Sequence, residues 1–278
     1  MQDVVWMALD CRIRAVHRGG LGAGAKARVR EPKDMAKFEW PNGKKAALSL
    51  TFDDARPSQI DVGLPVLDRY GIPGTFYVSP PAAEARLDAW RQAASRGHEI
   101  GNHTLSHPCS ESFLWSRENA LEDYTLELIE AEMDMASAYI EAKLGVRPAT
   151  FAYPCGQKFV GWGPVQQSYV PLVRERFIVG RSAFEKTAND PLLSDLAEAA
   201  AVDADGARFD QLKGYVDAAA AAGGWLIFLC HEVGALPGQA LDAGVLDELC
   251  AYATRGDSPL WIDTVEGVAK YILEQRKD

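Results

Sequence analysis

The chain alternates between short apolar runs and longer segments in which apolar residues recur at helical spacing. The apolar runs predict buried strands at 46–52, 74–79, 98–101, 149–153, 177–181, 225–230 and 259–262. The periodic segments predict helices at 60–70, 82–96, 118–144, 164–175, 207–222, 240–254 and 264–275. Strands that alternate with helices pair in parallel and are buried on both faces. We therefore expect an α/β fold, an irregular (β/α) barrel of about seven parallel strands in a single domain.

The longest predicted helix, 118–144, carries a stripe of Met, Leu and aromatic residues. Leu121, Leu128, Met135 and Tyr139 recur at helical spacing along it. Such a stripe is typical of the face that a helix turns toward the core. We expect these four residues to be buried rather than to line a cofactor site.

Polar side chains follow two of the predicted strands. Asp53 and Asp54 come at the end of the first strand, and His103 and His107 follow the third. In barrels of parallel strands, functional groups lie at the carboxyl ends of the strands. Two imidazoles and one carboxylate make a three-ligand set with room for a water, the usual form of a catalytic zinc centre. The other carboxylate is then free to act on that water.

Composition narrows the classes of partner. The chain has 278 residues and a net charge of −10, which argues against nucleic acid and anionic membrane surfaces as partners. No apolar stretch approaches the roughly 20 residues that a membrane-spanning helix needs. The sequence predicts no particular oligomeric state.

The first 37 residues differ from the rest of the chain in composition. We therefore expect an N-terminal extension at 1–37, followed by a catalytic barrel at 38–278. The apolar run from Val4 to Leu9 follows Asp3 rather than a basic cluster. A signal peptide has an apolar region of about 7–15 residues after positive charge. We therefore recognise no export signal and expect a cytoplasmic protein. A natural arm and a translation start at Met35 remain alternative explanations of the extension.

The two polar segments resemble known motifs. Thr51-Phe52-Asp53-Asp54 and His103-Thr104-Leu105-Ser106-His107-Pro108 are similar to the first two motifs of the polysaccharide deacetylases, carbohydrate esterase family 4. The resemblance extends from Ala46 to the C-terminus.

Within that resemblance, we assign Asp54, His103 and His107 as metal ligands and Asp53 as the general base. A carboxylate beside a divalent cation stays ionised and can accept a proton from water. The expected cofactor is a divalent metal, with zinc favoured and cobalt, nickel or manganese as alternatives.

Residues 147–156 resemble the third motif of the family with one important departure. The family often has Arg at the position of Ala152 and an aromatic residue at that of Cys155. The family's Arg braces the catalytic base. Another cation must therefore brace Asp53 here, or none does, and Arg181 is the candidate.

The family also uses a backbone N–H of this loop, together with the metal, as an oxyanion hole. By the resemblance, that N–H belongs to Cys155, with Tyr153 as the alternative. Tyr153 and Pro154 can also serve simply to turn the chain.

The segment 225–231 ends in Leu-Cys-His and is similar to the fifth motif. His231 would then protonate the leaving group, which suits a side chain whose ordinary pKa lies near neutrality. The fourth motif, an Asp that orients this His, is poorly matched, and Asp203 is the nearest candidate. On the loops after the second and third motifs, Trp115, Trp162 and Phe159 are candidates for stacking on sugar rings.

The five cysteines are at 11, 109, 155, 230 and 250. Their odd number and wide spacing are not those of a disulfide framework or a cysteine zinc finger. Cys109, Cys155 and Cys230 each lie within two residues of a motif residue. We favour small buried apolar side chains over a site that is sensitive to oxidation or soft metals.

The resemblance implies a hydrolase that removes acetyl groups from N-acetylated or O-acetylated oligosaccharides or polysaccharides. The alternative is an amidohydrolase that acts on a small cyclic amide or ureide, similar to allantoinase or cyclic-imide hydrolase. A third hypothesis is a carbohydrate-binding protein that keeps the fold without activity. The expected partner is therefore an acetylated oligosaccharide or a small-molecule substrate.

Overall fold

Eight parallel strands form the main sheet of the computed structural model, which describes residues 38–235 and 238–276. The seven predicted strands are all present within two residues at each end. The predicted extension, residues 1–37, lies outside the described residues. The strands are β1 (Ala46–Asp53), β2 (Thr75–Val78), β3 (Glu99–Asn102), β4 (Thr150–Ala152), β7 (Val179–Arg181), β8 (Val202–Asp203), β9 (Trp225–Cys230) and β12 (Leu260–Ile262).

The sheet curls until its two ends meet. Its order is β7-β4-β3-β2-β1-β9-β8, with β12 paired to the start of β1. Just before β8, Ala199 donates its N–H to the carbonyl of Gly180, and Ser182 donates to the carbonyl of Ala199, at 2.8 and 2.7 Å. These two bonds join β7 to the segment leading into β8. The fold is thus the irregular barrel of parallel strands that the sequence predicts.

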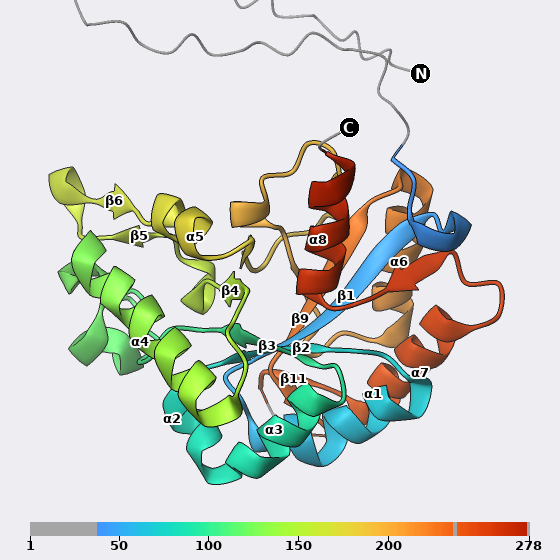
Figure 1. The fold of residues 1–278 in the computed structure, drawn as a ribbon, viewed down its shortest axis with the longest axis horizontal. Coiled ribbons are helices and arrows are strands. Elements are labelled where there is room, and N and C mark those ends of the chain that lie inside the picture. Colours follow the sequence, from blue (N-terminus) through green and yellow to red (C-terminus); the bar gives the residue numbers. More distant parts are fainter. Residues whose placement is uncertain (1–37, 236–237, 277–278) are drawn as a thin grey trace, which may run out of the picture. The chain divides into compact units, whose positions relative to one another are not determined.

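Each central strand is buried on both faces, and its side chains alternate between two cores. Leu48, Leu50 and Phe52 of β1 belong to the core beneath the outer helices. Ala47 belongs to a second core on the concave side, which α8 (Val265–Gln275) fills. Because successive strand residues point to opposite faces, Asp53 shares the concave face with Ala47. Figure 1 shows α8 on this side of β1 and β9.

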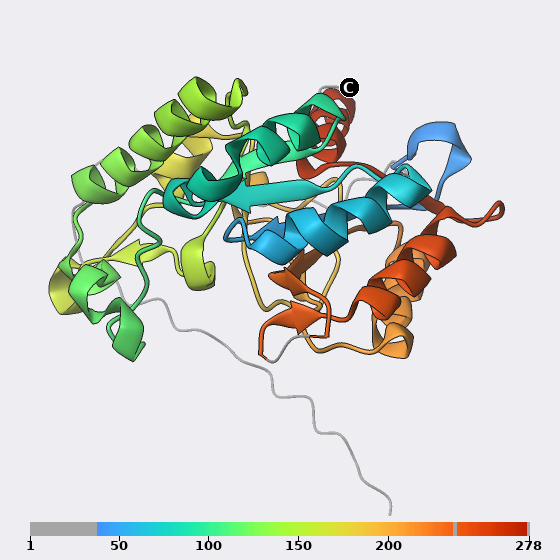
Figure 2. The ribbon, with the colours of Figure 1, turned by 90° about the horizontal axis from the view of Figure 1, so that it is seen from below.

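Helices cover the outside of the sheet and connect successive strands. Figures 1 and 2 show α4, α3, α1, α7 and α6 following one another around the strands. Their bounds are α1 (Leu64–Tyr70), α2 (Pro80–Ala83), α3 (Leu87–Ser95), α4 (Leu126–Leu144), α5 (Val170–Arg176), α6 (Phe209–Ala222) and α7 (Ala243–Thr254). Two short pairs of strands lie apart from the sheet: β5 (Phe159–Val160) with β6 (Gln167–Ser168), and β10 (Glu232–Val233) with β11 (Ala240–Leu241).

Three helix predictions begin too early, and in one of them, 240–254, the first two residues form β11 and the helix starts at Ala243. The helix predicted at 118–144 starts only after Thr125, whose hydroxyl accepts the N–H of Leu128 as an N-cap. The helix predicted at 164–175 starts at Val170, because residues 167–168 pair with β5 instead.

The predicted core stripe at 118–144 is right only in part: Leu121 is buried and Tyr139 is half-buried, but the other two residues are not. Leu128 and Met135 are 51% and 56% exposed. The buried face of the helix carries Ile129, Met133, Ala136, Ile140 and Leu144. The predicted stripe counts its helical spacing from residue 121, but this residue precedes the N-cap and lies in a separate 3-10 turn. The spacing therefore points to the wrong face of α4.

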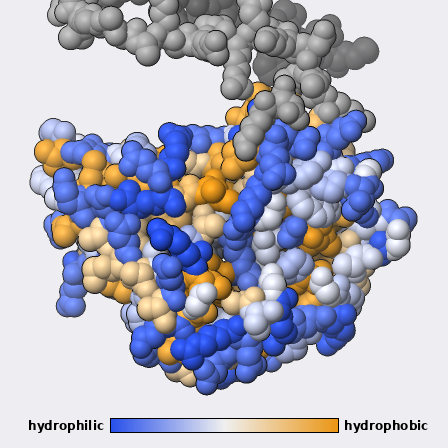
Figure 3. All heavy atoms as spheres, in the orientation of Figure 1, coloured by the Kyte–Doolittle hydropathy of each residue, from blue (hydrophilic) through white to orange (hydrophobic). Residues whose placement is uncertain are grey.

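The outer helices turn polar faces to solvent. In α3 only Trp90 and Ala93 are buried. Figure 3 shows hydrophilic residues gathered at the bottom of the view, over α1 and α3. Within residues 38–235 and 238–276, no helix is long and apolar enough to cross a membrane.

Candidate metal centre and active site

The loops that follow the strands enclose a cleft of about 820 Å³. Its walls include Asp53 at the end of β1 and Asp54 directly after it, His103 and His107 after β3, Cys155 after β4, and His231 after β9. Several non-glycine residues of these loops have positive φ angles, which is common where a site dictates side-chain direction. Among them are Asp54 (74°), His107 (54°), Cys155 (53°) and Phe184 (63°).

The three predicted metal ligands converge in this cleft. Oδ1 of Asp54 lies 3.5 Å from Nε2 of His103 and 3.4 Å from Nε2 of His107. Two ligand atoms that each lie ~2.0–2.1 Å from a tetrahedral zinc ion are separated by roughly 3.3–3.5 Å. The donor set and its spacing therefore fit a zinc-type site.

The tautomer of His103 also suits a ligand. Its Nδ1 lies 2.9 Å from the carbonyl oxygen of Ala152. A carbonyl can only accept, so Nδ1 carries the proton and Nε2 keeps its lone pair on the side of Asp54. A hydrogen bond of this kind orients metal-binding histidines.

The surroundings of Asp54 and His107 favour the protonation states that bind a metal ion. Burial alone would raise the pKa of Asp54, but His103, His107 and Arg56 outweigh burial and lower this pKa to about 2. Burial, followed by the neighbouring His103, lowers the pKa of His107 to about 4. At neutral pH the site thus offers a carboxylate and a neutral imidazole, the forms that bind divalent ions.

Asp53 lies beside this site and is held by a buried arginine. Nη2 of Arg181 donates to Oδ1 and Oδ2 of Asp53, each at 2.5 Å. Both side chains are almost completely buried. Arg181 and Val179 share the concave face of β7, because alternate strand residues point the same way. The cation that the sequence suggested as a brace is therefore in contact with Asp53.

The space for Arg181 depends on its neighbours. The guanidinium lies over the ring of Tyr77, 5.0 Å from the centroid. A Cβ at Gly101 would come within 2.5 Å of the same ring. Gly101 therefore leaves room for the aromatic platform beneath the Asp53–Arg181 pair.

His231 pairs with Asp205, so the prediction of Asp203 was wrong. Nδ1 of His231 lies 2.6 Å from Oδ2 of Asp205, and the N–H of His231 also donates to Asp205. Asp203, at the exposed end of β8, accepts the N–H of Asp205 and so shapes the turn. The turn therefore brings Asp205, rather than Asp203, to His231.

The pKa of His231 reflects this setting. Burial alone would lower it, but the hydrogen bond with Asp205 and the charges of Asp53, Asp205 and Asp54 raise it above the ordinary value. A protonated imidazole is the form that a general acid requires.

Gln59 is a site residue that the sequence did not reveal. Its buried Nε2 donates to the carbonyl oxygens of Asp53 at 2.5 Å and His231 at 2.9 Å. It lies in a π-helical turn, Gln59–Gly63, a feature that is frequent at functional sites. Gln59 thereby ties the ends of β1 and β9 together. A lone glutamine in a helical pattern gives no signal of this contact.

The two candidate oxyanion donors differ. The N–H of Tyr153 donates to the carbonyl of Arg181 within the sheet, so it is not available to a ligand. Among the hydrogen bonds of the described residues, none uses the N–H of Cys155. Cys155 follows Pro154 in a 3-10 turn and lines the cleft. The geometry thus favours Cys155 over Tyr153.

Two cysteines form a disulfide, contrary to the sequence prediction. Cys109 and Cys155 are bonded across a sequence separation of 46 residues. The bond links the loop after β3 to the loop after β4. Cys230 and Cys250 are free and buried, as predicted for Cys230.

The candidate aromatic contacts separate into two groups. Trp115 is 63% exposed, lines the cleft and lies 6.0 Å from the His107 ring, centroid to centroid. Trp162, which is 69% exposed, and Phe159 line other grooves. Phe113 and Phe184, which were not among the predicted contacts, line the cleft as well.

Known proteins share both sequence and fold with this chain. Residues 41–160 match the family model for polysaccharide deacetylase. Over 60 residues, the chain is 40% identical to the chitooligosaccharide deacetylase of Sinorhizobium fredii, which covers 21% of this chain and 28% of that protein. The matched curated relatives are covered over a minor part of their own length, from 4% to 36%.

Two solved structures show the fold. One, from Mycobacterium smegmatis and assigned to the polysaccharide deacetylases, has a TM-score of 0.65 at 18% identity over 87% of this chain and 94% of the other. The other is a family 4 acetyl xylan esterase from Clostridium thermocellum in complex with a cobalt ion. Its TM-score is 0.51 at 21% identity, over 81% and 91% of the two chains.

Proposed function

We propose that this chain, whose residues 41–160 belong to the polysaccharide deacetylase family, is a metal-dependent hydrolase that removes acetyl groups from acetylated oligosaccharides. The proposal rests on one observation above all. Asp54 meets two histidine nitrogens within 3.5 Å, and the adjacent Asp53 is held by Arg181 in the same cleft. We further propose zinc as the ion, with Asp54, His103 and His107 as its ligands.

A zinc ion there would supply Lewis-acid activation of water and of the acetyl carbonyl. The chain supplies the rest. Asp53 accepts the proton of the attacking water, and its contacts with Arg181 fix the direction of its carboxylate. The N–H of Cys155 donates to the oxyanion of the acetyl group. His231, oriented by Asp205, donates a proton to the departing nitrogen or oxygen.

The exposed aromatic side chains of the cleft suit a sugar substrate. Phe113 and Trp115 stack on each other at 5.6 Å beside His107, and Phe184 also lines the cleft. Small-molecule sites are commonly lined by aromatic side chains, with a few polar groups that fix the orientation of the ligand. The similarity to a chitooligosaccharide deacetylase supports an N-acetylated amino sugar, and no feature of the site favours the cyclic-amide alternative.

The test is the release of acetate from chitooligosaccharides by zinc-loaded protein. Asp53→Asn should lower turnover by about 10²–10⁴-fold, the usual contribution of a general base. Ring opening of a cyclic amide without acetate release would contradict the proposal. The cytoplasmic location predicted from the sequence stays a prediction, which cell fractionation would test.

Trp115 and Trp162 provide a matched pair for the substrate side. Both are exposed, but only Trp115 lines the cleft. Trp115→Ala should raise KM for oligosaccharides, whereas Trp162→Ala should leave it unchanged. Equal effects of the two substitutions would argue against sugar stacking at Trp115.

A further inference from the structure

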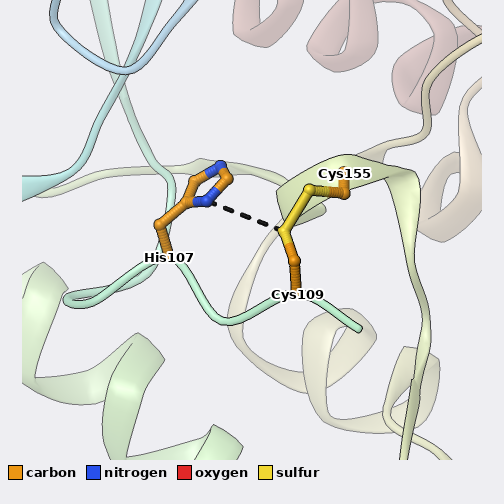
Figure 4. A group of neighbouring side chains, drawn as sticks. All are labelled: His107, Cys109 and Cys155. Atoms are coloured by element: carbon orange, nitrogen blue, oxygen red, sulfur yellow. Dashed lines mark hydrogen bonds between the residues drawn. A yellow bond between two sulfur atoms is a disulfide. The ribbon is translucent and has the colours of Figure 1, made fainter. Parts of the chain in front are cut away.

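The Cys109–Cys155 disulfide lies directly behind a proposed metal ligand. Cys109 is buried, while Cys155 lines the cleft and is reachable from it. Their Cα atoms are 6.2 Å apart, so the two side chains can meet as a disulfide or as neighbouring thiols. Figure 4 shows His107 with its ring beside this sulfur pair.

His107 stands between two groups of donors. Its Nε2 lies 3.4 Å from Oδ1 of Asp54, and its Nδ1 lies 3.7 Å from Sγ of Cys109 (Figure 4). The first group is Asp54, His103 and His107, and the second is His107, Cys109 and Cys155. Within each group the donor atoms all lie within 4.8 Å of one another. One imidazole is thus common to both.

We propose that the reduced protein has a second metal site, formed by Nδ1 of His107 and the thiolates of Cys109 and Cys155, for a thiophilic divalent ion such as zinc. One nitrogen and two sulfur ligands with an open fourth position form a known zinc donor set. While the sulfurs are bonded to each other, this set does not exist. The disulfide therefore decides whether the second site is available.

The chemical step is a thiol–disulfide exchange. An external dithiol gives two electrons and two protons, the S–S bond breaks to two cysteine thiols, and the dithiol becomes a cyclic disulfide. A divalent ion then displaces the two thiol protons and binds the thiolates.

The two sites exclude each other through His107. A neutral imidazole carries one proton and has one nitrogen lone pair to give. When Nδ1 binds an ion beside the sulfurs, Nε2 holds the proton and is lost to Asp54 and His103. Reduction thereby withdraws a ligand from the proposed catalytic site without unfolding the barrel.

Cobalt(II) is a direct probe, because bound thiolates give it charge-transfer absorption in the near ultraviolet. Full-length protein is reduced with a dithiol, freed of reductant without oxygen, and titrated with cobalt beside the oxidised protein. We expect the absorption in reduced protein only, saturating at about one ion per chain. A reduced protein with titratable Cys109 and Cys155 thiols and no such absorption would overturn the proposal.

Variants identify the donors. Cys109→Ser and Cys155→Ser should each lose the absorption, whereas Cys250→Ser, in α7 and away from the cleft, should keep it. His103→Ala should also keep it, because His103 belongs only to the first group. Absorption that survives Cys109→Ser would assign the cobalt to other thiols and contradict the site.

Exclusion is tested by stoichiometry. Reduced protein should bind one ion per chain, and two ions bound together would contradict the shared role of His107. The spectra are recorded without substrate. Failure of the proposed deacetylase activity would therefore leave this result intact, and a missing thiolate signal would leave the deacetylase proposal intact.

Discussion

Two buried carboxyl groups, Asp53 and Glu99, face the concave side of the same sheet but are stabilised in different ways. Their common face follows from the register, which pairs Thr51 with Thr75 and Thr75 with Glu99. Asp53 receives a guanidinium. Among the described residues, the donors to Glu99 are the hydroxyls of Thr75 and Thr150 and the N–H of Glu266 at the start of α8.

The lack of a cationic partner bears on the pKa of Glu99. Burial raises the pKa of Glu99 to about 7, although its neutral and N–H donors oppose this shift. Asp53 has a full opposite charge in direct contact. The fold thus pairs Asp53 with a cation where a base is proposed, and gives Glu99 only uncharged donors where it joins β2, β3, β4 and α8.

The largest expected effect comes from removing the cation. Arg181→Met would leave Asp53 as an unpaired buried carboxylate, which typically costs about 3–5 kcal/mol of unfolding free energy. Urea unfolding measures this cost. Arg86→Met is the control, because Arg86 and its partner Asp61 are exposed to solvent and their pair should contribute little to stability. Equal losses in the two variants would show that the Asp53–Arg181 pair is not stabilised as we describe.

The next effect is the pH dependence of the free energy of unfolding that Glu99 causes. Because its pKa rises from 4.5 to about 7 on folding, the folded protein holds this proton more tightly than the unfolded chain. The free energy of unfolding should therefore fall as pH rises through this window, by on the order of 3 kcal/mol for this group alone.

Glu99→Gln has no such proton to lose, so its stability relative to wild type should improve from about pH 4.5 to about pH 7 and change little above that. Unfolding at several pH values measures the trend, and the surface variant Glu141→Gln should show none of it. The difference in unfolding free energy between wild type and Glu99→Gln could instead be constant with pH. That result would mean that folding does not raise the pKa of Glu99.

The smallest expected effect is a shift in a pH profile. Asp205→Asn removes a charge that raises the pKa of His231, so the high-pH limb of kcat/KM on an amide should move to lower pH. Asp203→Asn should move it less, because Asp203 contacts the backbone of Asp205 rather than His231. A larger shift in Asp203→Asn would reverse our assignment of the two acids.

The strands and the group formed by Asp54, His103 and His107 could be predicted from the sequence, because both follow from local patterns. Each long strand is a bounded apolar run, and motif residues directly follow β1 and β3. The two-residue β8 is too short to leave such a pattern. The choice between Asp203 and Asp205 depends on a turn, which residue spacing alone does not settle.

Other features depend on contacts between distant segments. The Cys109–Cys155 bond requires the loops after β3 and β4 to meet, and the odd cysteine number hid it. Gln59 donates to the carbonyl of Asp53, 6 residues away in sequence, and to that of His231, 172 residues away. The contact of Arg181 with Asp53 follows from sheet curvature, which brings β7 to face the end of β1.

The central claim is that Asp54, His103 and His107 bind one divalent ion while the adjacent Asp53 does not. Calorimetric titration of zinc into the metal-free, disulfide-intact protein tests this claim without any substrate. Wild type and Asp53→Asn should each bind about one ion per chain, whereas Asp54→Asn and His103→Ala should bind far more weakly. Retention of zinc by Asp54→Asn together with its loss from Asp53→Asn would contradict the account.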